Sequence, residues 1–135
     1  SMEHVLGKAA AVALYRRAYP DLTIEVHIGD KYKPDVVALD AAGRPRFWAE
    51  SGTVSKQKLT KLFRRYPQTH FVFLRFGAVA PGFRALVERC IPEGHRGTVE
   101  VLGLPEDLAE RLEAGLRVVD CEYHNMNRGA CGHGH

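Results

Sequence analysis

The sequence is poor in cysteine and has no long apolar stretch. Three cysteines among 135 residues are an odd number, which does not suit a disulfide-stapled domain, so we expect a reducing compartment, the cytoplasm. No apolar run approaches the ~18 residues that a membrane span needs, so we expect no membrane partner. The sequence also lacks a P-loop, a GxGxxG fingerprint and a GxSxG elbow. These absences argue against nucleotide-driven and serine-hydrolase chemistry.

The composition fits one folded domain. Hydrophobic residues make up 45% and charged residues 26%, the balance of an ordinary globular protein. The net charge of +3 tolerates a polyanionic partner such as nucleic acid without requiring one. We expect a single domain over residues 2–123 and a mobile tail, rich in glycine and histidine, over residues 124–135.

The hydrophobic periodicity predicts an α/β chain. Helical patterns cover residues 3–18, 56–66, 81–90 and 105–114. Strand patterns cover residues 23–29, 35–40, 46–50, 70–76 and 98–102, and residues 116–123 are a candidate last strand. In the first strand, Ile24, Val26 and Ile28 alternate with polar residues, which predicts that these three face the core. The order α-β-β-β-α-β followed by α-β-α predicts a mixed sheet flanked by helices.

The strands at 35–40 and 46–50 predict a β-hairpin with Ala42 and Gly43 at its tip. Directly opposed side chains of a hairpin share one face, with Cβ atoms ~4.5–5.5 Å apart. The expected pairs are Asp35 with Glu50, Val37 with Trp48, and Leu39 with Arg46.

Asp35 and Glu50 are therefore candidate metal ligands. Two opposed carboxylates repel each other, and a divalent cation between them reverses the sign of that interaction. Carboxylate oxygens suit Mg²⁺ or Mn²⁺, which can activate water and neutralise charge on a phosphodiester. The alternative is a hairpin whose end carboxylates point into water, since a slip of one residue would separate them. Trp48 shares their face and fits a core position as well as the wall of a site.

These features resemble a known superfamily. A strand that begins Pro34-Asp35, a hairpin, and a strand that ends in Glu50, inside the αβββαβ order, resemble the PD-(D/E)xK nucleases with their restriction-endonuclease-like fold. The WAESG segment, followed by two helical lysines and an apolar strand, is most similar to the YaeQ-like group. The resemblance covers roughly residues 23–77. It implies a restriction-endonuclease-like αβββαβ core, here with a C-terminal α-β-α extension, and metal-dependent hydrolysis of DNA or RNA.

One position departs from the superfamily pattern. The catalytic lysine that follows the glutamate by two residues is Gly52 here. The resemblance then implies that a lysine of the next helix takes its place, Lys58 first and Lys61 second, while the backbone carbonyl of Ser51 completes the metal coordination. The alternatives are that both lysines belong to a solvated helix face, and that the chain is a catalytically degenerate member that binds nucleic acid or a protein.

Basic residues near the hairpin and the following helix are candidates for contacts with phosphates. Tyr32 lies between two of them and is suited either to stacking on a base or to an ordinary loop position. The candidate nucleic-acid-binding residues are Lys31, Tyr32, Lys33, Lys56, Arg64 and Arg65. Because double-strand cleavage generally needs two active sites, a homodimer is a plausible assembly.

The C-terminal segment offers soft ligands for Zn²⁺. The candidates are Cys121, His124, Cys131, His133 and His135. Their spacing matches no zinc module, and the alternative is a tail that binds no metal. Neither Cys90 nor Cys121 has a base partner nearby in the sequence, so we expect inert cysteines rather than a catalytic thiol.

Overall fold

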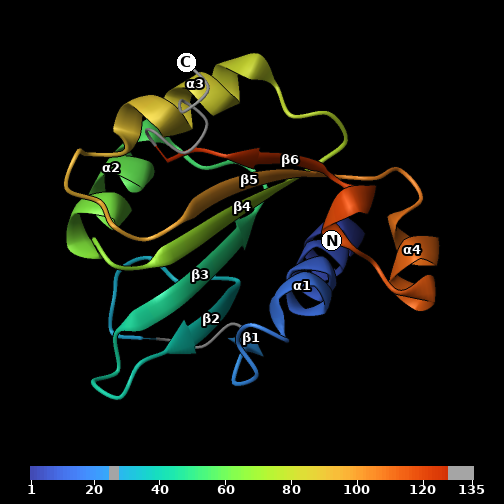
Figure 1. Ribbon diagram of the computed structural model, residues 1–135, viewed down its shortest axis with the longest axis horizontal. Helices are drawn as coiled ribbons and strands as arrows, with labels where there is room; N and C mark the ends of the chain where they lie inside the picture. The colour runs from blue at the N-terminus through green and yellow to red at the C-terminus, as the bar shows by residue number, and fades with distance from the viewer. Residues whose placement is uncertain (25–27, 128–135) are drawn as a thin grey trace.

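The computed structural model describes residues 1–24 and 28–127. They form a six-stranded mixed sheet in the order β1-β2-β3-β4-β5-β6, with helices on both faces (Figure 1). The helices are α1 (Met2–Tyr15), α2 (Lys56–Arg65), α3 (Pro81–Cys90) and α4 (Leu108–Ala114), with a 3-10 turn η1 (Val118–Asp120). The strands are β1 (Thr23–Ile24), β2 (Val36–Leu39), β3 (Pro45–Ser51), β4 (His70–Phe76), β5 (Val99–Leu104) and β6 (Glu122–Asn125). None of the described helices is long and apolar enough to cross a membrane.

Alternation along the central strands builds a separate apolar core on each face of the sheet. Strands β3, β4 and β5 run parallel, and the outer strands pair antiparallel. Trp48 and Phe71 face α2 and α3, whereas Phe47 and Val72 face α1 and α4. The nearly continuous apolar run of β4 is therefore covered on both sides, as is typical of a central parallel strand.

The hairpin register is confirmed in the middle and wrong near the tip. Val37 pairs with Trp48 as expected, but Leu39 pairs with Pro45 instead of Arg46. The chain closes its turn between Asp40 and Arg44, whose backbone groups bond at 2.8 Å, and Gly43 adopts a left-handed φ of 82°. This loop is one residue longer than a two-residue turn, and an irregularity after Ala38 absorbs the extra residue.

Two strand predictions also need correction. Strand β1 is short, and Ile24, expected in the core, is 51% exposed because β1 lies at the sheet edge. Residues 25–27, including Val26, lie outside the described residues. The proposed strand at 116–123 begins later, since Asp120 accepts a bond from the amide of Arg117 and closes η1. Strand β6 follows, so the C-terminal extension is α-β-α-β. This last strand crosses the boundary predicted between the domain and the tail, which lay between residues 123 and 124.

Candidate functional site

Asp35 and Glu50 lie at the end of the β2–β3 hairpin remote from its tip. The amide of Asp35 donates to the carbonyl of Ala49 at 3.1 Å, so the residue before β2 bonds the same residue of β3 that Val36 pairs with. This bond places Asp35 at the same end of the hairpin as Glu50. Electrostatic repulsion from Asp35 is one of the influences that raise the pKa of Glu50. The two carboxylates therefore interact unfavourably, as expected for a pair that shares one end of a hairpin.

The Glu50 carboxylate is buried on the face of the sheet that α2 covers. Its side chain is 7% exposed, and its two oxygens accept hydrogen bonds from Trp48 Nε1 at 3.0 Å and Lys58 Nζ at 2.5 Å. Burial is the largest influence on its pKa and raises it, Lys58 and Trp48 oppose that rise, and Asp35 adds to it. The net effect is a raised pKa, and Lys58 is the strongest of the influences that oppose the rise.

Local signals in the sequence explain why Lys58 reaches Glu50. Gly52, with a left-handed φ of 93°, ends β3 and redirects the chain toward α2. Ser55 then caps α2, its hydroxyl accepting from the amide of Lys58 at 3.1 Å. Lys58 therefore lies in the first turn, beside the carboxylate. Lys61 lies one turn further along, and the lysine that pairs with Glu50 is Lys58.

Asp35 is held by β3 and by α1. Its Oδ2 accepts from the amide of Ser51 at 2.9 Å, and its Oδ1 lies 3.5 Å from Nε2 of His4. Helix α1 approaches closely here, since a Cβ on Gly7 would lie 2.6 Å from the Ser51 hydroxyl. No local pattern in the sequence pointed to His4, because 31 positions separate it from Asp35.

A second acidic residue, Asp30, organises the loop before the hairpin. Its side chain is 2% exposed and accepts from Arg65 at 2.6 Å, from the hydroxyl of Tyr66 and from the amide of Tyr32 at 2.9 Å. Burial acts to raise the pKa of Asp30, but these bonds and the charge of Arg65 outweigh it, so the pKa is lowered. No pattern in the sequence pointed to this network, which anchors Tyr32 to α2.

The loop aromatic Tyr32 lies next to two lysines. The ammonium groups of Lys31 and Lys58 lie 5.5 and 5.3 Å from its ring centroid, and its side chain packs partly against the core. Lys33, Lys56 and Arg64 are exposed, whereas Arg65 is engaged by Asp30. The predicted nucleic-acid residues thus gather on the loop at 30–33 and on α2.

Only some of the predicted zinc ligands lie among the described residues. Cys131, His133 and His135 lie outside the described residues. Burial, and to a lesser extent Asp120, raises the pKa of the Cys121 thiol to about 11, which disfavours the thiolate that binds metal. His124 lies in β6 and pairs with Glu122 at 2.6 Å. Within residues 1–24 and 28–127, no three or more His, Cys, Asp or Glu side chains gather as a metal-binding group.

A buried polar cluster that no sequence pattern indicated connects α1 to the sheet. Glu100 of β5 accepts from Tyr15 at 2.9 Å, from Tyr123 and from a ring nitrogen of His70. The other ring nitrogen of His70 bonds the hydroxyl of Tyr19 at 2.8 Å. Burial acts to raise the pKa of Glu100, but the bonds outweigh it and lower the pKa. This cluster sets the position of α1, which carries His4 toward Asp35.

Comparison with known proteins shows a shared fold. The chain is similar to the YaeQ protein from Xanthomonas axonopodis pv. citri, with a TM-score of 0.56 and 18% identity over 86% of this chain and 63% of that one. It spans less than two thirds of that protein's length. A YaeQ protein from Pseudomonas syringae is 18% identical, with a TM-score of 0.49 over 79% of this chain and 55% of that one. No protein-family model and no curated protein match the sequence.

Proposed function

We propose that this chain is a YaeQ-like member of the PD-(D/E)xK superfamily and hydrolyses phosphodiester bonds of DNA or RNA with Mg²⁺ or Mn²⁺. The observation that carries the proposal is the bond between Lys58 and Glu50. The superfamily pattern places its lysine two residues after the glutamate, where this chain has Gly52. Lys58, delivered from α2, brings an ammonium group to the same carboxylate at 2.5 Å. A lysine thus lies beside Glu50, although it comes from the following helix and not from the strand that carries Glu50.

The residues present fit a magnesium-like ion. Mg²⁺ is typically held by one or two carboxylates, keeps several waters and accepts substrate phosphate oxygens. Asp35 and Glu50 supply two carboxylates, and the carbonyl of Ser51 would be a third oxygen ligand. Burial is the main reason for the raised pKa of Glu50, and Asp35 adds a smaller electrostatic repulsion, which a cation near both carboxylates would relieve. The hard oxygen donors and the scarcity of other ligands suit this ion better than zinc.

The charged groups around the site would have different roles. A bound ion would supply Lewis-acid stabilisation and a water of lowered pKa. Lys58 lies between Glu50 and the ring of Tyr32, a position from which its ammonium group can orient a water or contact a phosphate oxygen. His4, 3.5 Å from Asp35, holds that carboxylate on the side of α1. The loop at 30–33 and α2 offer exposed cations for the rest of the nucleic-acid backbone.

The direct test compares cleavage of labelled DNA and RNA by wild-type protein and three variants in Mn²⁺ and Mg²⁺. Asp35→Asn and Glu50→Gln preserve shape but remove the metal-binding charge, and Lys58→Met removes the ammonium group. We expect each to lower the cleavage rate by about 10²-fold or more, as loss of a preorganised catalytic group does. Lys61→Met is the matched control and should stay within about threefold of wild type, since Lys61 does not bond Glu50.

Titration with Mn²⁺ alone measures the metal site independently of activity. Asp35→Asn and Glu50→Gln should each weaken Mn²⁺ binding, whereas Lys58→Met should preserve or strengthen it because it removes a competing positive charge. Cleavage that persists in both carboxylate variants would refute the nuclease proposal. Unchanged Mn²⁺ binding in both would refute the metal site.

One observation favours a second function, a degenerate member that binds nucleic acid without cleaving it. Both oxygens of Glu50 already accept hydrogen bonds from protein groups, and Asp35 is bonded by Ser51. Such a protein would bind DNA or RNA with an affinity that falls steeply with salt and would show no metal-dependent turnover. Homodimer formation and a cytoplasmic location stay predictions, and sedimentation of the purified chain with and without a DNA duplex would test the former.

A further inference from the structure

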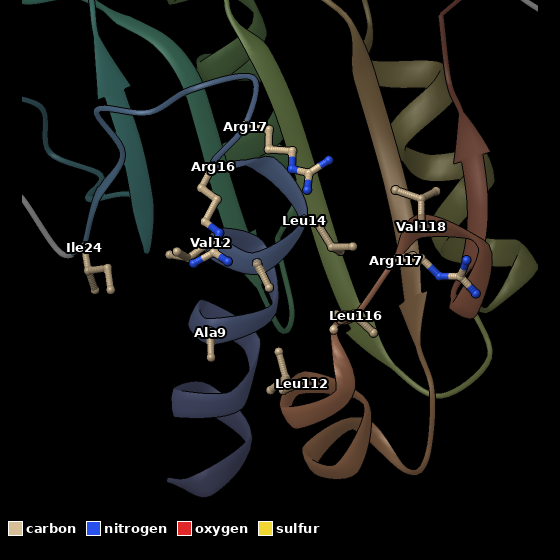
Figure 2. Close-up of a pocket in the computed structure, with 12 residues that line it drawn as sticks. Ala9, Val12, Leu14, Arg16, Arg17, Ile24, Leu112, Leu116, Arg117 and Val118 are labelled. Carbon is tan, nitrogen blue, oxygen red and sulfur yellow. The ribbon is translucent and has the colours of Figure 1, made fainter.

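A groove of about 710 Å³ runs between α1 and the chain that follows α4, on the face of the sheet opposite α2 and α3 (Figure 2). Its apolar lining comes from α1, from β1, and from α4 and the segment after it. The larger apolar residues are Val12, Leu14, Ile24, Leu112, Leu116 and Val118. Ile24 and Val118 are 51% and 36% exposed, so aliphatic surface remains open to water at the rim of the groove.

Three arginines border this apolar surface. Arg16 and Arg17 follow the end of α1, and Arg117 lies on the opposite wall (Figure 2). All three are exposed, and none of the twelve described residues that line the groove is acidic. Asp120 lies 4.0 Å from Arg117, but its side chain is only 8% exposed and it also bonds Arg111. The groove therefore presents cations around an aliphatic floor.

The groove is separate from the candidate phosphodiester site. His4, beside Asp35, and Arg16 lie near opposite ends of α1, and twelve residues of helix span about 18 Å. The loop and α2 residues that suit nucleic acid lie on the other face of the sheet. A phosphate backbone would use the arginines and leave the aliphatic floor without a partner, so nucleic acid matches only half of the surface.

We propose that this groove binds an acidic amphipathic helix from a partner protein. Such a helix presents apolar side chains at i, i+3, i+4 and i+7, which fit a floor of valine and leucine, and carboxylates beside them, which fit the arginines. Residues 9–17 at the end of α1 line the groove, so this wall is about 12 Å long, enough for about two turns of a partner helix. A single ligand of this kind would contact both the arginines and the apolar floor of the groove. This interaction is independent of the proposed hydrolytic activity.

The test uses the full chain and synthetic fluorescein-labelled peptides of 14 residues. The first peptide carries leucines on one helical face and glutamates on its flanks; a second replaces the glutamates by glutamine, and a third replaces the leucines by serine. We expect fluorescence anisotropy to show micromolar binding of the first peptide and binding at least about tenfold weaker for each of the others. A 20-base-pair DNA duplex serves as the polyanion without an apolar face.

Charge-reversal variants locate the binding. Arg16→Glu combined with Arg117→Glu should weaken binding of the acidic peptide at least about tenfold. Arg89→Glu, an equally exposed arginine on α3, is the control and should change it less than about twofold. Methyl NMR spectra of wild-type protein, titrated with the same peptide, should show the largest shifts at Val12, Leu112 and Val118.

Three results would overturn the proposal. Equal binding of the serine and leucine peptides would show that the floor contributes nothing. Loss of duplex binding in the Arg16 and Arg117 double variant, larger than its loss of peptide binding, would identify the groove as a nucleic-acid surface. Peptide-induced methyl shifts confined to other parts of the protein, or no binding of the acidic amphipathic peptide at all, would exclude the groove as its site.

Discussion

Replacing Lys58 by methionine should destabilise the fold in a strongly pH-dependent way. The change leaves the Glu50 carboxylate, 7% exposed, without the one cationic partner that it has among the described residues. Removing one member of a fully buried ion pair costs ~3–5 kcal/mol, and because Lys58 is itself 20% exposed, we expect about 2–4 kcal/mol at pH 7. Methionine keeps most of the aliphatic length, so the loss reports the charge rather than packing.

The sign of the pH dependence follows from the pKa of Glu50. Burial already raises this pKa in the folded state, and loss of Lys58, which lowers it, must raise it further. A carboxyl group with a raised folded pKa loses stability as the pH rises from its unfolded value, ~4.3, through the folded value. The variant should therefore lie within about 1 kcal/mol of wild type at pH 4, where Glu50 is protonated, and diverge from it toward pH 7.

Urea denaturation, followed by tryptophan fluorescence, measures the free energy of unfolding of wild type and variant at pH 4 and at pH 7. The protein has a single tryptophan, Trp48, whose indole bonds Glu50 at 3.0 Å, so the probe lies beside the altered charge. Lys61→Met, on the same helix but not bonded to Glu50, should change the free energy of unfolding by less than about 0.5 kcal/mol at either pH. A loss in Lys58→Met that is equal at both pH values, or equal in Lys61→Met, would refute the reasoning.

Two further stability predictions rest on buried contacts. Asp30→Asn should cost about 2 kcal/mol at pH 7, since it removes the charge that Arg65 pairs with. Because the pKa of Asp30 is lowered on folding, the wild-type advantage is complete above the ordinary value, ~3.9, and shrinks as the pH falls toward the folded value. Urea titrations that show the same gap at pH 3 as at pH 7 would contradict this reasoning. Gly97→Ala should cost about 3 kcal/mol or more, because the new Cβ would lie 1.9 Å from the carbonyl oxygen of Thr69. Gly94→Ala, which meets nothing within 4 Å, is the control for thermal melts, and equal melting of the two variants would disprove the clash.

The local pattern of the sequence predicted the hairpin correctly except at its tip. Alternation of apolar residues sets Val37 against Trp48, and the structure has this pair. The tip was misjudged because Ala42-Gly43 suggested a two-residue turn. Asp40, whose carboxylate accepts from the amides of Ala42 and Arg44 at 2.9 Å each, closes a longer loop instead. An aspartate that begins a turn is itself a sequence signal, so this error was avoidable in principle.

The candidate site was predictable in its parts and not in its assembly. The helical pattern over residues 56–66 placed Lys58 and Lys61 on one helix, but periodicity alone cannot say which of them reaches a strand. That choice depends on the direction in which the chain leaves β3 at Gly52, a tertiary fact. The edge position of β1 likewise decided that Ile24 would be exposed in spite of its alternating pattern.

What the sequence by itself determined is local: the helices, most strands and the central hairpin register, because each depends on residues within one or two elements of each other. Only the tertiary structure brought His4 to Asp35, because α1 must first pack across the sheet. It also buried Glu100 among side chains from α1, β4 and β6. Such contacts join distant positions, and their geometry follows from how whole elements pack rather than from any pattern along the chain.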